Sequence, residues 1–362
     1  EKAGVKIKKA FIGIGGIGVS SLAQYYLAQD WRVSGSDAAR SEITDELKKK
    51  GVRVFIGQRA QNIKGVNLVI YSAAIKPENP EFSQAKTKGY PLQSYAQAVG
   101  ELTKKYFTIA VAGSHGKSTT TALIGLILVE AGLDPTIIVG TKLRELEGLP
   151  FREGEGRSFS GAGNNFRLGQ SRYLVLEADE YAKSFHNYFP KIAVVTNIDK
   201  EHLDIYKNLA GVLAGFKKFF GNISADGYIV ANREDKNIKK ILDLKPQTLK
   251  PKIIWYSNGK YKLSIPGIHN QFNAAAAWQA VKLLGVKKSV ADKIFKTYTG
   301  AWRRLERLKP KPYTLNAILY SDYAHHPTEI KATLQALKEK YPKKKIICVF
   351  QPHQQDRLNR LF

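Results

Sequence analysis

The sequence predicts an α/β protein built on parallel β-sheets, because short apolar segments alternate with helical segments along most of its 362 residues. Two glycine-rich turns each follow an apolar segment and open a helical one, an arrangement typical of phosphate-binding units. The length predicts two or three domains, each able to bury a core. We expect a Rossmann-like N-terminal domain (1–105), a central P-loop-type α/β domain (106–309) and the truncated start of a third Rossmann-like domain (310–362).

The predicted strands are short and rich in Val, Ile and Ala, as buried parallel strands are. They are Ala10–Ile14, Trp31–Ser36, Leu68–Tyr71, Thr108–Ala112, Tyr173–Leu176, Ile192–Thr196, Tyr228–Ala231 and Ile346–Phe350. The predicted helices between them are Ser20–Ala28, Lys117–Ala131, Leu209–Phe220 and Phe272–Leu284. We expect the first domain boundary in the linking segment Glu101–Tyr106, and the second at the charged, proline-containing stretch KPKP, 309–312.

The composition predicts a globular protein that attracts anions. Lys and Arg number 57 against 31 Asp and Glu, which gives a formal net charge of +26. Such a field favours nucleic acid or polyphosphate ligands, but the lysines are spread along many helices without a recognisable nucleic-acid module, so we expect no nucleic-acid partner. No apolar run approaches the roughly 18 residues of a membrane span, and the single Cys348 excludes an intramolecular disulfide framework. We therefore expect a cytoplasmic protein without a membrane partner.

The first glycine-rich turn, GIGGIG at 13–18, fits the pattern GxGxxG between a strand and a helix. Its glycines allow backbone N–H groups and the helix N-terminus to approach a diphosphate. Asp37 ends the second predicted strand, 19 residues beyond Gly18, where a carboxylate could accept a hydrogen bond from a ribose hydroxyl. The motif does not distinguish NAD from a UDP-sugar, since both contain ribose and diphosphate. A pure packing role for the turn is the remaining interpretation.

The second glycine-rich turn, GSHGKST at 113–119, is a variant phosphate loop between a strand and a helix. In such loops backbone N–H groups surround the phosphates, the lysine contacts the β- and γ-phosphates, and the following hydroxyl binds Mg²⁺. Lys117 and Ser118 stand at those two positions. The standard pattern starts with a glycine where this chain has Val111, so the loop is shorter than usual. We predict that it binds ATP.

Acidic residues and a histidine follow two of the predicted strands, in the segments EADE (177–180) and NIDKEHLD (197–204). Open α/β sheets bind their ligands at the carboxyl ends of the strands. Mg²⁺ takes only one or two carboxylates in addition to phosphate oxygens and water. Glu177 and His202 are therefore our candidate metal ligands. We expect the other acidic residues, Asp179, Glu201 and Asp204, to be solvated loop residues.

Taken in order, the short phosphate loop and five later motifs resemble the Mur ligases, and the resemblance spans essentially the whole chain. Those five motifs are EADE, NIDKEHLD, HNQFN (269–273), RRLE (303–306) and DYAHHPTE (322–329). The N-terminal segments GIGGIGVS, VSGSD (33–37) and YSAAIKP (71–77) match as well. Each motif alone is weakly specific, whereas their ordered combination is highly specific.

The resemblance implies an ATP-dependent ligase that joins L-alanine to the carboxylate of UDP-N-acetylmuramate through an acyl phosphate, in peptidoglycan precursor synthesis. It implies ATP and Mg²⁺ as cofactors, and Lys117, Glu177 and His202 as catalytic residues. One alternative is the recycling ligase that attaches a tripeptide to the same sugar acid. The other is an NAD-dependent oxidoreductase built on the first turn, which leaves GSHGKST unexplained.

The resemblance also implies a role for individual residues. The UDP-linked substrate would contact Gly13, Gly15, Gly16, Ile17, Gly18, Asp37, Ser72, Asn165 and Arg167. ATP would contact Gly113, Ser114, His115, Gly116, Lys117, Ser118, Thr119, Asn270, Asn273, Arg304 and Asp322. Ser118 and Glu177 would bind one Mg²⁺ and His202 a second, and the amino-acid side would be lined by Tyr323, His325 and Arg357. Gln354 departs from the family pattern, because it stands where the first of two arginines is expected.

Overall fold

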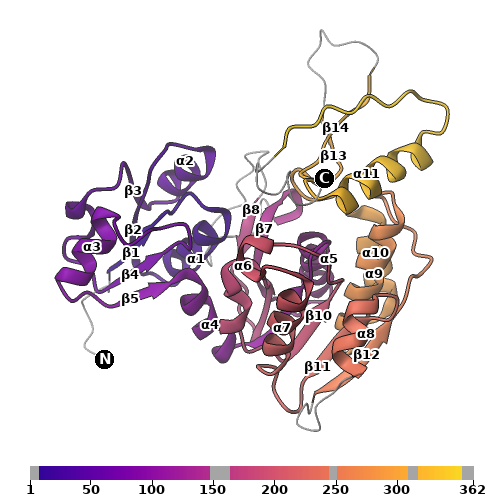
Figure 1. Ribbon diagram of the computed structural model, residues 1–362, viewed down its shortest axis with the longest axis horizontal. Helices are drawn as coiled ribbons and strands as arrows, with labels where there is room; N and C mark the ends of the chain where they lie inside the picture. Colours follow the sequence, from indigo (N-terminus) through magenta and orange to yellow (C-terminus); the bar gives the residue numbers. More distant parts are fainter. Residues whose placement is uncertain (1–7, 147–163, 244–250, 309–316, 353–362) are drawn as a thin grey trace.

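The protein contains two parallel sheets from successive parts of the chain, followed by a small antiparallel pair of strands (Figure 1). A computed structural model describes residues 8–146, 164–243, 251–308 and 317–352. The alternation of strands and helices, and the parallel pairing within both large sheets, confirm the predicted α/β class. None of the described helices combines the length and the apolar character needed to cross a membrane.

The N-terminal unit is a five-stranded parallel sheet in the order β3-β2-β1-β4-β5. Its strands are β1 (Lys8–Ile12), β2 (Arg32–Asp37), β3 (Arg53–Ile56), β4 (Leu68–Tyr71) and β5 (Leu92–Ser94). Its helices are α1 (Ile17–Ala28), α2 (Glu42–Lys49), a 3₁₀ turn (Ala60–Ile63), α3 (Pro80–Thr87) and α4 (Tyr95–Lys105). Phe11 of β1 packs on the side of α1 and α4, whereas its neighbours Ala10 and Ile12 pack on the side of α3. Both faces of the sheet are therefore covered, as parallel sheets require.

The central unit is a seven-stranded sheet in the order β12-β11-β10-β6-β9-β7-β8, in which only β8 runs antiparallel. Its strands are β6 (Phe107–Ala112), β7 (Thr136–Leu143), β8 (Asn164–Arg167), β9 (Tyr173–Glu177), β10 (Ile192–Val195), β11 (Tyr228–Asn232) and β12 (Lys252–Tyr256). Its helices are α5 (Lys117–Glu130), α6 (Leu203–Tyr206), α7 (Leu209–Phe220), α8 (Lys236–Asp243), α9 (Ile268–Lys282) and α10 (Lys288–Thr297). Two short 3₁₀ segments, Arg144–Leu146 and Tyr181–Asn187, complete this unit.

The two faces of the central sheet pack against different partners. One face packs against α5, α9 and α10 in a core that contains Ile109 and Val111 of β6. The other face shares one continuous core with α7, α8 and helices α1 and α4 of the N-terminal unit, and Ala110 and Ala112 of β6 point into it. The N-terminal unit is therefore attached to the central sheet through a buried apolar surface.

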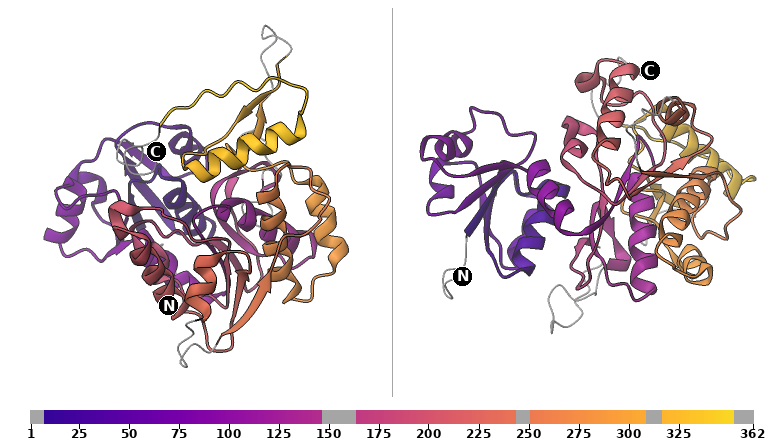
Figure 2. Two further views of the ribbon diagram at one scale, coloured as in Figure 1. Left: turned by 45° about the vertical axis from the view of Figure 1, so that its right-hand side comes forward. Right: turned by 90° about the horizontal axis from the view of Figure 1, so that it is seen from below.

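The last described segment contributes β13 (Glu306–Leu308), β14 (Leu319–Ser321) and α11 (Pro327–Lys340). Figures 1 and 2 show α11, in yellow, beside α9 on the side of the central sheet away from the N-terminal unit. The phosphate loop at the start of α5 lies between these outer parts. This arrangement places residues of all three parts of the chain around one edge of the central sheet.

One prediction about secondary structure is wrong. Ile346–Phe350 does not form a strand: Ile347 is 79 % and Val349 94 % exposed, and no described strand lies beside the segment to pair with it. A strand is stable only when a neighbour satisfies its backbone groups. The segment Glu101–Tyr106, expected to link the first two units, contains the end of α4, which begins at a capping box formed by Ser94 and Gln97 and ends at Lys105, just before β6. The KPKP stretch (309–312) lies outside the described residues.

Candidate functional site

The first glycine-rich turn connects β1 to α1 at the carboxyl edge of the N-terminal sheet. Gly13 has φ +79°, and a Cβ at this position would lie 3.0 Å from Cβ of Ser72, which follows β4. The backbone N–H of Gly15 donates to Oδ2 of Asp37 at 2.8 Å. Asp37 and Ser72 therefore both lie beside the turn. This is expected, because all three lie at or just after the ends of strands at the same edge of the sheet.

Asn165 and Arg167 of β8, expected to face the substrate, are engaged by the protein itself. The side-chain amide of Asn165 donates to the carbonyl of Ile17 (2.6 Å) and to Oγ of Ser20 (2.9 Å), and its oxygen accepts from Gln24 (2.8 Å). The guanidinium of Arg167 binds Asp134 and the carbonyl of Pro135. In these contacts Asn165 joins β8 to α1, and Arg167 joins β8 to the segment just before β7. Contact of either residue with the substrate stays a prediction.

The phosphate loop connects β6 to α5 and is held in place by the segment after β10. Gly113 and Gly116 have φ values of +135° and +83°, which favour glycine. The backbone N–H of His115 donates to Oδ1 of Asn197 (2.8 Å), and the N–H of Asp199 donates to Oγ of Ser114 (2.8 Å). Because β6 and β10 are adjacent in the sheet, the NID segment at 197–199 reaches the loop directly.

Lys117 is the first residue of α5, and its ammonium group is enclosed by acceptors. It lies 2.7 Å from the carbonyl of Gly113 and 2.9 Å from a carboxylate oxygen of Glu180, which is fully buried. Burial by itself would lower the pKa of Lys117, but the negative charges of Glu180, Asp179 and Glu177 outweigh burial and raise it. Lys117 is therefore charged at neutral pH. The sequence assigned Glu180 no role, although it ends the EADE motif.

Ser118 and Glu177 form a pair of oxygen donors at the carboxyl end of β9. The hydroxyl of Ser118 donates to Oε1 of Glu177 at 3.2 Å, and the N–H of Gly140 on β7 donates to Oε2 at 2.9 Å. Burial is the main cause that raises the pKa of Glu177. A hydroxyl and a carboxylate beside a phosphate loop are the hard oxygen ligands that Mg²⁺ prefers, so these residues fit a magnesium ion.

His202 lies on the same side of the loop but near different acids. Its Nε2 is 3.8 Å from Oε1 of Glu180, and Asp179, Glu180 and His202 each offer one ligand atom within 4.8 Å of the others. Both His202 and Glu177 line a cavity of about 470 Å³ that Lys117 and Ser118 also line. Asp179 and Asp204 are exposed, as expected for solvated residues.

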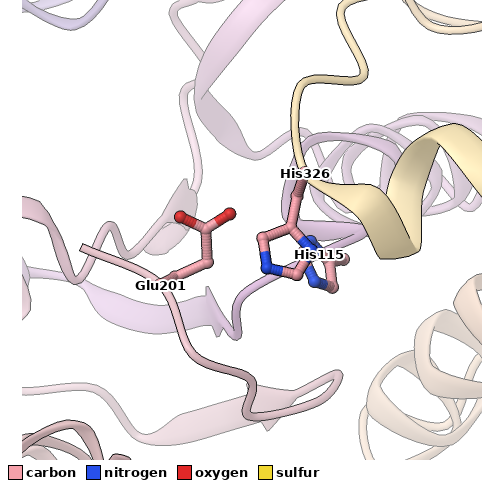
Figure 3. Close-up of side chains that lie close together, drawn as sticks. All are labelled: His115, Glu201 and His326. Carbon is pink, nitrogen blue, oxygen red and sulfur yellow. The ribbon is translucent and has the colours of Figure 1, made fainter. Parts of the chain in front are cut away.

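His115 of the loop lies beside Glu201, from the segment after β10, and His326, which directly precedes α11 (Figure 3). Its Nε2 lies 3.2 Å from Oδ2 of Asp199, and its Nδ1 lies 3.4 Å from Oε1 of Glu329 on α11. Burial opposes protonation, but the hydrogen bonds and charges of these acids outweigh it and raise the pKa of His115 to about 9. His326 lies beside it, with ring centroids 4.8 Å apart. Glu201 is only 3 % exposed in this cluster, so the expectation that it is solvated is wrong.

With the exception of Gly113, the residues expected at the nucleotide line a second cavity, of about 360 Å³, next to the loop. Among its lining residues are Ser114, His115, Gly116, Lys117, Ser118, Thr119, Asn270, Asn273, Arg304 and Asp322. On α9, the amide of Asn273 donates to Asn270 and its oxygen accepts from the hydroxyl of Thr120. Sequence reasoning missed Glu329, which accepts from Arg304 at 3.3 Å and also lines the cavity.

Two of the residues expected on the amino-acid side line the same cavity as His202 and Glu177. Tyr323 and His325 contact each other with ring centroids 4.9 Å apart, and both line the cavity of about 470 Å³. Arg357 and Gln354 lie outside the described residues. Ile17 of the first glycine turn lines the same cavity, opposite Lys117 and Ser118 of the second. Both glycine turns thus contribute to one cavity.

A phosphate loop with buried acids, set between two further units, defines a multidomain nucleotide-binding α/β protein. Comparison with known families specifies it further. Residues 8–107 match the catalytic domain of the Mur ligase family, residues 111–260 the Mur ligase middle domain, and residues 303–362 the Mur ligase glutamate ligase domain. The chain belongs to the Mur ligase family.

Individual relatives are similar over nearly the whole chain. A UDP-N-acetylmuramate–L-alanine ligase from Aquifex aeolicus is 39 % identical, over 99 % of this chain and 80 % of its own length. The ligase of the same name from Alkaliphilus metalliredigens is 38 % identical, over 97 % and 78 %. Among solved structures, the UDP-N-acetylmuramate–alanine ligase from Thermotoga maritima superposes with a TM-score of 0.80 at 28 % identity, over 96 % of this chain and 81 % of that one.

Proposed function

We propose that this protein joins L-alanine to the carboxylate of UDP-N-acetylmuramate at the expense of ATP, in peptidoglycan precursor synthesis. One observation carries the proposal: a single cavity is lined by Ile17 of the first glycine turn and by Lys117 and Ser118 of the phosphate loop. A diphosphate-linked substrate on one turn and a triphosphate on the other would meet there. The names of the relatives support L-alanine as the amine. Since ATP and UDP-linked precursors are cytoplasmic, we place the reaction in the cytoplasm.

The proposed chemistry has two steps. A carboxylate oxygen of the sugar acid attacks the γ-phosphorus of ATP, the bond to the bridging oxygen breaks, and ADP leaves with the electron pair. The amine nitrogen of L-alanine then attacks the carbonyl carbon of the acyl phosphate. Phosphate leaves, and the nitrogen loses a proton to solvent. No side chain forms a covalent bond in either step.

The residues of the site would serve mainly to position and neutralise two anions. Lys117, charged and held by Glu180, would contact the terminal phosphates, and the loop N–H groups would surround them. Ser118 and Glu177 would hold one Mg²⁺ and His202 a second, and these ions when bound would supply positive charge against the phosphate oxygens. Asn270 and Asn273 would face the adenine, and Arg304 and Asp322 the rest of the nucleotide. Holding the reactants in one orientation supplies much of the rate enhancement in such ligases.

The decisive experiment measures phosphate release from ATP with UDP-N-acetylmuramate and different amines. We expect release that depends on L-alanine and that is lost in Lys117→Met. Release with a tripeptide but not with L-alanine would favour the recycling ligase. Oxidation or reduction of a nicotinamide cofactor, followed by absorbance, with no phosphate release would favour the oxidoreductase.

A further inference from the structure

Lys142 is a buried lysine that connects the central unit to the N-terminal unit. It lies on β7, its side chain is 3 % exposed, and its ammonium group is 2.9 Å from Glu42 and 2.8 Å from Glu46. Both acids lie on α2, a helix of the N-terminal unit. Burial by itself would lower the pKa of Lys142, but the hydrogen bonds and charges of Glu46 and Glu42 outweigh burial and raise it. The contact is therefore an ion pair across two units.

The two residues before Lys142 connect the same strand to the candidate active site. The N–H of Gly140 holds the carboxylate of Glu177, the candidate metal ligand. The hydroxyl of Thr141 donates to the carbonyl of Trp302 (3.0 Å), and the N–H of Trp302 donates to the carbonyl of Lys142 (2.9 Å). We call residues 140–142 the β7 brace. It contacts the N-terminal unit, Glu177 and the segment that leads to Arg304.

The brace is a second attachment point, separate from the main one. The N-terminal unit is already fixed to the central unit where α1 packs on β7 and β8, through Tyr25 against Phe166 and through the amide of Asn165. Helix α4 also packs on the central unit, against β6 and the 3₁₀ segment Tyr181–Asn187. Lys142 anchors a third helix, α2, and so opposes a displacement of α2 relative to β7. Only the lysine of this contact is buried: the side chains of Glu42 and Glu46 are 60 % and 27 % exposed.

We propose that Lys142 is a positioning residue for the ligase reaction, which sets the orientation of the first glycine turn relative to the phosphate loop. The inference rests on the proposed function, because it concerns the distance between a carboxylate on one unit and a phosphate on the other. Such a transfer requires reacting atoms about 3–3.5 Å apart, and a displacement of about 1 Å can lower the rate about a hundredfold.

The test compares Lys142→Met with the wild type in phosphate release and in binding. We expect kcat to fall about 10- to 100-fold, while the Kd values for UDP-N-acetylmuramate and for a non-hydrolysable ATP analogue stay within about threefold. Removing the acids instead, with Glu42→Gln and Glu46→Gln together, should lower kcat similarly. Adding Lys142→Met to that pair should cause no further loss, because all three residues act as one contact.

The matched control is Arg40→Met, which removes an exposed ion pair with Asp45 at α2 without touching the central unit. We expect its kcat to equal that of the wild type. A kcat of Lys142→Met within twofold of the wild type, or losses that add in the combined variant, would overturn the inference. A fall in Tm with an unchanged kcat per folded molecule would mean that Lys142 only stabilises the fold. That result would also overturn the inference.

X-ray scattering of the full chain separates failure of this inference from failure of the proposed function. We expect Lys142→Met to show a broader distribution of distances between the units than the wild type or Arg40→Met. This readout needs no substrate. If the wild type releases no phosphate with L-alanine, the proposed function fails, and scattering still decides the inference: identical profiles for all three proteins would refute the brace.

Discussion

The two glycine-rich turns of this protein share a backbone plan and differ in charge. Each connects a parallel strand to a helix and uses a glycine with positive φ. The first turn carries no charged side chain, and Asp37 accepts a hydrogen bond from its backbone. The second carries Lys117 and His115, which are paired with carboxylates from three other segments: Glu180, Asp199 and Glu329.

This difference shows how one local structure serves two tasks. A neutral turn can hold a diphosphate by backbone N–H groups alone, and that suits a group that stays bound unchanged through the reaction. In the proposed reaction the charged loop would face the phosphates that react, where negative charge must be neutralised. Because buried charges need partners, its cations are paired with carboxylates in the structure. A triphosphate that binds the loop competes with Glu180 and Glu329 for the same cations.

The largest effect on activity is expected when the lysine of the charged loop is removed, a residue that has no counterpart in the neutral turn. Lys117→Met should lower phosphate release by about a thousandfold or more, since it removes the cation at the transferred phosphate. Binding of UDP-N-acetylmuramate, measured by calorimetry, should stay unchanged. The exposed Lys104, which pairs with Glu101 on α4, offers a matched control in Lys104→Met. Equal rates for Lys117→Met and the wild type would remove the catalytic assignment.

A second prediction compares the loss of ligand binding when one glycine of each turn is replaced by alanine. Gly116 combines φ +83° with contact to the amide of Asn273, so Gly116→Ala should weaken binding of an ATP analogue about a hundredfold. A Cβ at Gly15 would lie 2.8 Å from Oδ2 of Asp37, a side chain that can move. Gly15→Ala should therefore weaken UDP-substrate binding only about tenfold. Calorimetry with each ligand checks both, and the reverse order of effects would contradict the comparison.

The third prediction concerns pH and applies only to the charged loop. The pKa of His115 in the folded protein is about 9, above its unfolded value of about 6.5, so protonation stabilises the fold. This stabilisation is complete below about pH 6.5 and is lost as the pH rises through 9. His115→Asn should therefore lower Tm by several degrees at pH 6.5 and by less at pH 10. A difference in Tm that stays constant with pH would show that His115 is neutral.

The smallest effect is expected at the neutral turn. Asp37→Asn replaces a charged acceptor by a neutral one, which weakens the hydrogen bond from Gly15 and any bond to a ribose hydroxyl by about 1 kcal/mol. Binding of UDP-N-acetylmuramate should weaken about fivefold, and binding of the ATP analogue should not change. An equal loss for both ligands would mean that the two turns are coupled.

Much of this protein can be predicted without coordinates because the information is local. The alternation of apolar strands and helices predicts the sheets, and contiguous motifs such as GIGGIG and GSHGKST predict where phosphates bind. The contacts of Asn165 could not be predicted, because they depend on the packing of α1 against β8, more than a hundred residues away in sequence. The prediction of a strand at Ile346–Phe350 was wrong for a related reason, since strand pairing depends on a neighbouring strand and not on the segment itself.

The sequence by itself determined the two turns, the order of the units and the positions of Lys117, Ser118 and Glu177, because backbone conformation and strand ends follow from neighbouring residues. Only the tertiary structure decided which acids pair with the cations. Glu180, Glu201 and Glu329 look like ordinary charged residues in the sequence. In the structure Glu180 and Glu201 are buried and the side chain of Glu329 is 11 % exposed, because the sheet and α11 close around the loop. Burial and charge pairing depend on distances in space, which no local pattern contains.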